Sequence, residues 1–479
     1  MILINRLSLA TLMVVILTGP ALAQAVAPTL YLPAVLKHPD AVGATHVVAT
    51  TGSDAGPGTL AQPWRTVQHA VDQAEPGDII AVRAGTYVED VLIQTPGTAN
   101  AWITLRGYGA ERPVLRSTGG SPTVYFYHDD CDEGVIGSGS GNTDCRAFYW
   151  ELRGLEIQGS PSGDYAVKID TPRVRLIENR LCCTVADVVK LVRTANDVEI
   201  LNNEIWQNPG IVTPGANAQG IDIVGADRVR VAGNYLHDVP DIGIYAKGNA
   251  RQALFEDNRL VNIGGAANGH ALMLGQSTDA ERLVDGPYES YDGLVRNNVV
   301  VGATWACLAT ASSYNARFYN NSCYNTGQLV HGSILLSNES EIGQTGAHLA
   351  FVNNIVYGSS ARPVFKIASD AMADYSTLVI DRNLYYVTGG APQFAASDFF
   401  SAVGFADWGT NYTGLSGRVD DSLVADPLYV TLTGATPLTL AFHSPALNVG
   451  RLMALVPTDR LGLARPQGVG VDLGAYERP

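Results

Sequence analysis

The chain has 479 residues, a formal net charge of −15, and 46% hydrophobic against 16% charged residues. This acidity argues against a nucleic-acid partner, because neutralising phosphates requires a basic surface. The length exceeds that of one ordinary globular core. A body of stacked repeats, in which each repeat contacts only its neighbours, is the architecture that fits.

The first residues have the pattern of a secretory signal peptide. Arg6 supplies the positive charge, residues 7–17 are apolar, and Ala21-Leu22-Ala23 forms an A-x-A cleavage site. We therefore predict a signal peptide over 1–23 and a secreted, extracellular protein, with an uncleaved N-terminal anchor as the alternative. No later run reaches 18 apolar residues, so no membrane segment is predicted after cleavage.

Two segments precede the main body of the chain. Residues 24–45 are rich in proline and alanine and are predicted to be a flexible leader, and residues 46–117 are predicted to be a start module. A short helix is expected in the start module because apolar residues recur there at helical spacing. These residues are Val67, Ala70, Val71 and Ala74. Such a helix can cover the first coil of a strand repeat and shield its open edge.

A short apolar stretch with a central asparagine recurs within residues 118–390, which we predict to be the body of coils. The asparagines are Asn179, Asn203, Asn234, Asn258, Asn298, Asn321, Asn354 and Asn383. Their spacings are 24, 31, 24, 40, 23, 33 and 29 residues, a period typical of solenoids. Apolar and polar residues alternate, which indicates strands. We predict an all-β parallel β-helix whose asparagines occupy left-handed turns and hydrogen-bond between coils.

Both ends of this body resemble a known family. The run SDAGPGTLAQPWRTVQHAVDQAEPGDIIAVRAGTYVEDV (53–91) resembles the entry segment of secreted bacterial right-handed parallel β-helix proteins of the pectate-lyase superfamily, including polysaccharide lyase family nine. The run Ser444–Glu477 is similar to the segment that closes such helices, and residues 391–479 are predicted to be C-terminal coils and a cap. The resemblance implies a right-handed parallel β-helix that acts on polysaccharide.

Six cysteines in an exported chain can form disulfides. Cys131 and Cys145 bracket a polar loop and are predicted to pair. The other four are Cys182, Cys183, Cys307 and Cys323, which either pair or serve as small buried hydrophobic residues. No spacing matches a zinc site.

A second strand lies about 12 residues before each of the first four asparagines, in the segments AVKIDT, VVKLVR, GIDIVG and GIYAKG. Alternation places one set of side chains in the core. This set is Val167, Ile169, Val189, Leu191, Ile221, Ile223, Ile244 and Ala246. Two outward columns remain, namely Lys168, Lys190, Asp222 and Tyr245, and Asp170, Val192, Val224 and Lys247. Three of the five lysines of the chain therefore gather on one face.

Lysine on such a face suits β-elimination of a uronate polymer. A base removes the proton next to the sugar carboxylate, and a nearby cation lowers the pKa of a lysine enough for it to act. The family resemblance implies this arrangement, with a lysine base and acidic Ca²⁺ ligands. Lys247 is the first choice for the base. Lys190 and Lys168 are the reserves, or the groups that hold substrate carboxylates.

Loops beside these strands add the acidic residues Asp187, Asp227, Asp238 and Asp241. Asp222, Asp238 and Asp241 are the candidate ligands of Ca²⁺, a cation that takes several carboxylate oxygens. Candidate substrate-binding residues are Tyr245, His237, His270, Arg282 and Arg317. The 40-residue step after Asn258 indicates an inserted loop, and loops on a rigid scaffold often carry binding function.

Three functions remain open at this point. A lyase acting as a monomer on an acidic polysaccharide is the first. A glycoside hydrolase is the second, in which paired carboxylates such as Asp222 and Asp241 lie about 5.5 Å apart for retention or about 6.5 to 9.5 Å apart for inversion. A non-catalytic carbohydrate-binding surface protein is the third, because the chain lacks the Asp-Asp pair with an adjacent acidic residue that marks the calcium site of family-nine lyases.

Overall fold

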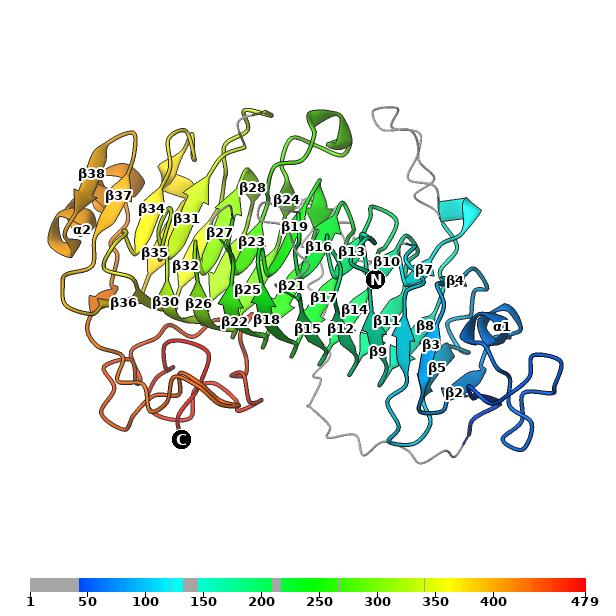
Figure 1. Cartoon of the computed structure of the whole chain (residues 1–479). Coiled ribbons are helices and arrows are strands. Elements are labelled where there is room, and N and C mark those ends of the chain that lie inside the picture. The colour runs from blue at the N-terminus through cyan, green and yellow to red at the C-terminus, as the bar shows by residue number, and fades with distance from the viewer. Residues whose placement is uncertain (1–42, 121, 132–144, 209–216, 266–267, 340) are drawn as a thin grey trace, which may run out of the picture. The chain divides into compact units, whose positions relative to one another are not determined.

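The computed structural model describes residues 43–120, 122–131, 145–208, 217–265, 268–339 and 341–479 (Figure 1). The predicted signal peptide and nearly all of the predicted leader lie outside the described residues. No helix in the described part is long and apolar enough to cross a membrane.

Three long sheets, here called A, B and C, build the described body (Figure 1). Sheet A contains β1 (His46–Val48), β2 (Ile79–Val82), β5 (Ile103–Gly107), β8 (Trp150–Arg153), β11 (Val174–Ile177), β14 (Glu199–Leu201), β17 (Arg230–Ala232), β21 (Leu254–Glu256), β25 (Leu294–Arg296), β29 (Arg317–Tyr319), β32 (Ala350–Val352) and β35 (Val379–Asp381). Sheet B contains β3 (Thr86–Val88), β6 (Val114–Arg116), β9 (Glu156–Gln158), β12 (Arg180–Cys182), β15 (Glu204–Trp206), β18 (Tyr235–Val239), β22 (Arg259–Ile263), β26 (Val299–Ala303), β30 (Ser322–Thr326), β33 (Ile355–Gly358), β36 (Leu384–Val387) and β39 (Leu423–Val424).

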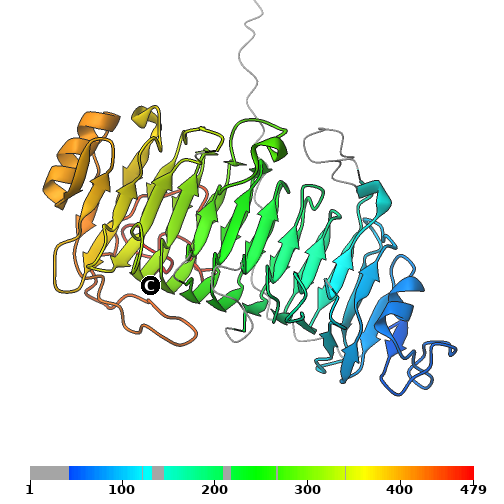
Figure 2. The same ribbon diagram turned by 45° about the horizontal axis from the view of Figure 1, so that its top comes forward.

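Sheet C carries the outward columns predicted above. It contains β4 (Val91–Ile93), β7 (Val124–Phe126), β10 (Val167–Ile169), β13 (Val189–Leu191), β16 (Ile221–Val224), β19 (Ile244–Lys247), β23 (Leu272–Leu274), β27 (Leu308–Ala311), β31 (Ile334–Ser337), β34 (Phe365–Ile367), β37 (Phe394–Ala396) and β38 (Phe400–Val403). Its strands lie side by side in chain order (Figure 2). They pair in parallel except for the last pair, β37 with β38. The chain therefore winds as a parallel β-helix.

Smaller elements lie at the corners and ends of the coils. The short strands β20 (Ala250–Arg251), β24 (Ser290–Tyr291) and β28 (Ser313–Tyr314) form a fourth parallel sheet. The 3-10 helices are η1 (Asp129–Cys131), η2 (Ala280–Arg282) and η3 (Tyr375–Thr377). The predicted capping helix is α1 (Val67–Asp72), whose Val67, Ala70 and Val71 are buried. A longer helix, α2 (Phe405–Ser416), follows sheet C and buries Trp408 in the core of the coils.

The eight inward residues predicted from alternation, from Val167 to Ala246, are all fully buried in one continuous hydrophobic core. The prediction is confirmed because strands in successive coils keep the same register, so that each apolar side chain stacks on its equivalent one coil away.

The buried asparagine ladder is confirmed, but the prediction placed the left-handed turn residues one position too late in the chain. Each ladder side chain bonds to the next coil: the Asn234 amide nitrogen and side-chain Nδ2 both donate to Oδ1 of Asn258, at 3.0 Å. The left-handed φ falls on the preceding residue, for example 57° at Asp257, and not on the ladder asparagine itself. The ladder asparagine instead contributes its side chain as a partner for buried backbone groups, such as the Val231 carbonyl that accepts from Asn258 Nδ2.

We predict that Asn258→Ala lowers the free energy of unfolding by about 3 kcal/mol, because buried backbone groups lose their partners. The Asn234 amide loses its acceptor, and the Val231 carbonyl loses the Nδ2 donor at 2.8 Å. Urea-induced unfolding measures this loss. Asn100→Ala at an exposed turn is the matched control and should change stability by less than about 0.5 kcal/mol. Equal effects for the two variants would contradict the structural role of the ladder.

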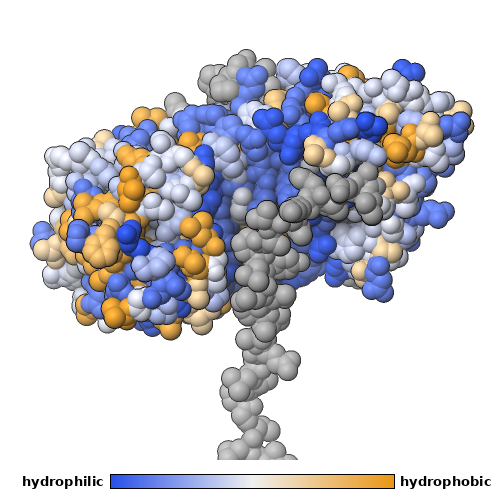
Figure 3. Space-filling view, turned by 90° about the horizontal axis from the view of Figure 1, so that it is seen from below, coloured by the Kyte–Doolittle hydropathy of each residue, from blue (hydrophilic) through white to orange (hydrophobic). Residues whose placement is uncertain are grey.

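Ion pairs run between coils on the outer faces of sheets A and B. Arg180 lies between Glu156 at 3.2 Å and Glu204 at 2.8 Å on sheet B, and Arg230 binds Glu256 at 2.7 Å on sheet A. Seen from below, the middle of the molecule is hydrophilic, with hydrophobic residues gathered to the left (Figure 3). On the outer faces of sheets A and B, oppositely charged side chains of adjacent coils pair with one another, which stabilises the stack of coils.

The cysteine prediction is corrected by the structure. Disulfides join Cys182 to Cys183 and Cys307 to Cys323, which are the four residues for which pairing was left open. The bridge predicted between Cys131 and Cys145 is not among the disulfides of the described residues, and most of the loop between them lies outside those residues. The prediction relied on loop polarity, which says nothing about which cysteines the coils bring into contact.

Candidate active site

The outer face of sheet C brings the predicted column together. Lys168 is the register partner of Lys190, Lys190 of Asp222, and Asp222 of Tyr245, on four successive coils. Val224 pairs in the same way with Lys247, in the neighbouring column. The alternation read from the sequence therefore places three lysines and a carboxylate on one face, as predicted.

Lys190 is held by two carboxylates at the centre of this face. Its Nζ donates to Asp222 on the next coil and lies 3.4 Å from Asp187 Oδ2, three residues earlier in the chain. Burial by itself lowers the pKa of Lys190, but the Asp222 and Asp187 carboxylates outweigh it and the pKa is raised. Lys190 therefore stays protonated at neutral pH in this arrangement.

Asp187 is a buried carboxyl group whose surroundings disfavour its charged form. Its side chain is 1% exposed, and burial together with the Asp222 charge raises its pKa well above the usual range, although Lys190 opposes the shift. Asp241, one corner further on, has its pKa raised to about 6 by burial. It accepts hydrogen bonds from Gln219 Nε2 at 3.0 Å and from the Ile242 amide at 2.8 Å. Burial therefore favours the protonated form of both carboxyl groups.

Lys168 forms a separate pair at the start of the column. Its Nζ donates to Asp170 Oδ2 at 3.0 Å and to the Tyr125 hydroxyl at 3.1 Å. Burial raises the pKa of Asp170, against the effect of Lys168. These contacts tie Lys168 to its own coil and to the coil before it.

Lys247 is the last residue of β19 and lies beside the inserted loop. Its Nζ donates to the Ser277 carbonyl at 3.2 Å and lies 5.1 Å from the Tyr245 ring centre, and it forms no ion pair within the described residues. Glu289 fastens the loop by accepting from the Gly248 amide at 2.8 Å and from Thr278. The predicted long insertion is therefore packed against the candidate base.

Tyr245 is almost fully buried, at 1% exposure, although it belongs to the outward column. Burial, followed by the charges of Asp222 and Asp187, raises the pKa of its hydroxyl well above the usual value. Tyr245, predicted as a substrate-binding residue, is therefore a buried, neutral phenol beside the carboxylate pair.

The three predicted calcium ligands are not brought together. Asp222 belongs to sheet C, whereas Asp238 lies on β18 of sheet B, where it bonds to His237 Nδ1 at 2.8 Å and to Asn262 Nδ2 at 2.6 Å. Across the described residues, no group of three His, Cys, Asp or Glu side chains is placed to hold a metal ion. The oxygen-rich part of the site is Asp187 and Asp222, with Gln219 beside Asp187.

The predicted substrate-binding residues are spread over several faces. His237 on sheet B stacks between Trp206 and Tyr235. His270 is buried beside Trp305 and His331, and its pKa is lowered to about 3 by burial, then by His331. A neutral, buried imidazole offers no positive charge to an acidic sugar.

The two predicted arginines also lie apart from Lys190. Arg317 is on β29 of sheet A and donates to the Asp292 carbonyl at 2.8 Å. Arg282 ends η2 in the inserted loop, and its side chain is outside the described part of the structure.

Gln219 was missed by the sequence analysis. It stands three residues before Asp222, as Asp187 stands three residues before Lys190. The backbone N–H of Gln219 donates to Asp187 Oδ1 at 3.4 Å. The coil alignment could have found it, because residues at this offset share one corner beside sheet C. Polar residues at that corner, and not the loops on sheet B, complete the site.

Comparison with known proteins identifies the fold family. The family model described as Pel9A-like, right handed beta helix region matches residues 46–241, a span that includes Lys190, Asp187, Asp222 and Asp241. The chain therefore contains a right-handed β-helix region that is similar to those of pectate-lyase-superfamily proteins. The residues matched by this family model therefore form the first part of the β-helix and most of the candidate site.

Curated relatives match parts of this chain. Pectate lyase PEL9 of Emericella nidulans is 34% identical over 133 residues, which cover 27% of this chain and 31% of that protein. The protein YwoF of Bacillus subtilis strain 168, described as uncharacterized, is 25% identical over 222 residues, which cover 40% of this chain and 46% of that protein. The chain thus spans less than half the length of either relative.

Two solved structures share the whole architecture. The crystal structure of pectate lyase Pel9A matches with a TM-score of 0.55 and 15% identity, over 92% of this chain and 98% of that one. The complex of XylC with xylose matches with a TM-score of 0.53 and 12% identity, over 91% and 98%. At these identities the likeness shows the fold alone, and it confirms the predicted right-handed parallel β-helix.

Proposed function

We propose that this chain is an exported polysaccharide lyase that cleaves a uronate-containing, pectate-like polymer by β-elimination, with Lys247 as the base. The observation that carries the proposal is the contrast between the lysines on sheet C. Lys168 and Lys190 are held by carboxylates, whereas Lys247 bonds only to a carbonyl and contacts a phenol ring. Among these three lysines, Lys247 is therefore the one whose amine no carboxylate of the described residues holds in an ion pair.

The chemistry requires a base and a positive charge on one face. The Lys247 amine, in its unprotonated form, removes the proton at C5, and the electron pair forms the C4–C5 double bond. The bond from C4 to the glycosidic oxygen breaks, and the departing oxygen takes up a proton from solvent. Lys190 stays protonated between Asp187 and Asp222. Its ammonium is positioned to attract the sugar carboxylate, because its side chain is the partly exposed member of this group, at 17%.

Calcium is the proposed cofactor, and the donor chemistry at Lys190 is suited to it. Asp187 Oδ2 and Asp222 Oδ1 are buried oxygens without a hydrogen-bond partner, and so is Oε1 of Gln219. Hard cations bind carboxylate and amide oxygens of this kind. Asp187, Asp222 and Gln219 would hold the ion, which when bound supplies charge that makes the α-proton of the uronate more acidic. Lys190 would then leave these two carboxylates, and the calcium ion would take over from its ammonium the role of attracting the sugar carboxylate.

A second candidate function is favoured by the carboxyl pair. Burial and the Asp222 charge raise the pKa of Asp187, while the Asp222 side chain accepts a hydrogen bond from Lys190. Two neighbouring carboxyl groups in such different environments are suited to glycoside hydrolysis, one as acid and the other as base or nucleophile. This alternative needs no lysine base.

The products separate the two candidates. Purified protein is incubated with pectate, pectin, alginate and glycosaminoglycans, with calcium and with chelator, and both near-ultraviolet absorbance and new reducing ends are measured. A lyase yields a 4,5-unsaturated uronate at every cleavage, so we expect absorbance and reducing ends to rise together on one polymer. Reducing ends without absorbance would establish the hydrolase, and neither signal on any polymer would leave the non-catalytic, carbohydrate-binding function.

A further inference from the structure

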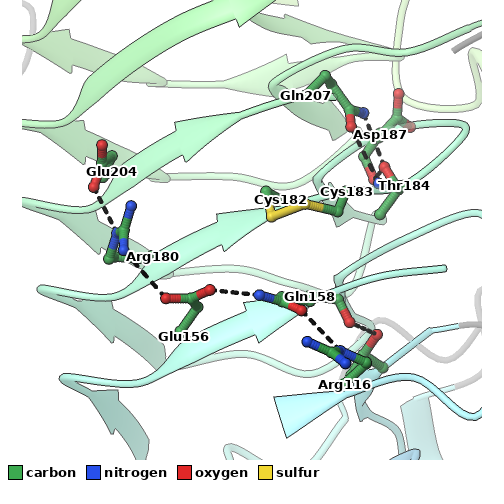
Figure 4. The surroundings of a disulfide bond; sticks show 11 residues. Arg116, Glu156, Gln158, Arg180, Cys182, Cys183, Thr184, Asp187, Glu204 and Gln207 are labelled. Atoms are coloured by element: carbon green, nitrogen blue, oxygen red, sulfur yellow. Dashed lines mark hydrogen bonds and ion pairs between the residues drawn. A yellow bond between two sulfur atoms is a disulfide. The ribbon is translucent and has the colours of Figure 1, made fainter. Parts of the chain in front are cut away.

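A disulfide between two neighbouring residues stands at the corner that leads into the candidate site (Figure 4). Cys182 is the last residue of β12 and is fully buried, and Cys183 begins the turn with a left-handed φ of 75°. Residues other than glycine seldom adopt that conformation. The covalent bond thus joins the end of a strand to the first residue of the corner.

The adjacent coils hold the same corner from both sides. Gln207 of the next coil accepts from the Thr184 amide at 3.1 Å, and its Nε2 donates to Thr184 Oγ1 at 2.8 Å and to the Ala186 carbonyl at 2.5 Å (Figure 4). Gly159 of the preceding coil packs so closely that a Cβ there would lie 2.3 Å from Thr184 Cγ2. The corner is therefore in close contact with the coils on both sides.

This corner ends at Asp187, the buried carboxyl group of the site. The Thr184 hydroxyl donates to the Ala186 carbonyl at 2.8 Å and reaches the Asp187 carbonyl at 3.4 Å. The Asp187 side chain then meets Lys190 and Asp222. A carboxyl group with 1% exposure depends on its exact surroundings, so a shift of the corner changes the whole charge cluster.

The disulfide has little effect on the unfolded chain. Stabilisation by loop closure grows with the number of residues that a disulfide encloses. Cys182 and Cys183 are one residue apart, whereas Cys307 and Cys323 are separated by 16. The first disulfide therefore acts mainly on local geometry, and the second provides a comparison in the same protein.

We propose that the Cys182–Cys183 disulfide is a positioning element that fixes Asp187 against the Lys190–Asp222 pair. Neither cysteine contacts the substrate. The consequence for catalysis rests on the proposed function, whereas the consequence for stability is independent of any substrate. This assigns a role to two cysteines that would otherwise only fill space at the corner.

A double-mutant cycle tests the proposal. Stability is measured by urea unfolding for Cys182→Ala/Cys183→Ala, for Asp187→Asn, and for the combination. We expect the effect of Asp187→Asn on the unfolding constant to differ at least tenfold between the intact and the disulfide-free background. The matched cycle with Cys307→Ala/Cys323→Ala should show a coupling below twofold. Equal coupling in both cycles, or none in the first, would overturn the proposal.

Reduction of the native protein covers the case in which the alanine variant fails to fold. A water-soluble phosphine converts the disulfide to two thiols and is oxidised to the phosphine oxide. Cys183 is half-buried, whereas Cys307 and Cys323 are fully buried and should resist mild treatment. We expect the reduced protein to remain folded. The effect of Asp187→Asn on its unfolding constant should differ at least tenfold from the effect in the protein with the disulfide intact. An unchanged response rejects the positioning role. A changed response in a protein that cleaves no polymer rejects the proposed function only.

Discussion

Lys247→Ala is expected to lower kcat by about 10³-fold, the usual contribution of a positioned general base. The folded state should be unaffected, because the side chain is only partly buried and makes one hydrogen bond, to the Ser277 carbonyl. The melting temperature should change by less than about 2 °C. Initial rates of unsaturated-product formation, together with thermal unfolding, measure both quantities.

Lys247→Arg separates the role of a base from that of a positive charge. Arginine keeps the charge but does not lose its proton in proteins. If Lys247 is the base, the arginine variant is as inactive as the alanine variant. If Lys247 only attracts the substrate carboxylate, the arginine variant retains most of the activity. Lys366→Ala, on β34 in the outward column of Lys190 and Tyr245, is the matched control and should keep its activity.

The repeats made the scaffold predictable from the sequence. The spacing of ladder residues such as Asn234 and Asn258 reports the length of each coil, and strict alternation around them fixes which side chains enter the core. The register of Lys190, Asp222 and Tyr245 followed from that alignment alone. A stacked fold repeats one local rule, so a single alignment determines many contacts.

The chemistry of the site was less predictable, since it depends on corners and burial. Asp238 was predicted as a calcium ligand because it was placed in a loop beside the sheet C strands, but it lies on β18 of sheet B, and sheet C is reached only at β19. Burial of Tyr245 and the pairing of Lys190 with Asp187 depend on how neighbouring coils and loops pack. A single sequence carries no signal for either effect.

Lys190→Ala is expected to lower the free energy of unfolding by about 3 to 5 kcal/mol at neutral pH, because it leaves buried carboxylates without their counter-ion. Asp187 and Asp222 are 1% and 0% exposed, so water cannot replace the ammonium. Lys190→Arg retains the charge and should lose less stability. Urea unfolding across a pH series measures both variants.

The pH dependence has a definite sign. The pKa of Asp187 is raised above its usual value near 3.8 in the folded state, so the folded chain retains a proton that the unfolded chain releases. Stability from this group is present below about pH 4 and is lost as pH rises towards the folded-state pKa. Removing Lys190 raises that pKa further, and the variant should lose stability with rising pH more steeply than the parent. Equal slopes would contradict the buried pair.

Calcium gives the same variant a second, independent measurement. If Asp187 and Asp222 hold the ion, Lys190 competes with it for the same oxygens, and Lys190→Ala should bind calcium at least about tenfold more tightly. Binding to the folded state raises stability with the logarithm of ligand concentration, so calcium should restore much of the stability lost in Lys190→Ala and less in the parent. Calorimetric titration measures the affinity without any substrate. If the variant gains neither affinity nor stability, these carboxylates do not form a calcium site, and their charge serves only to keep Lys190 protonated.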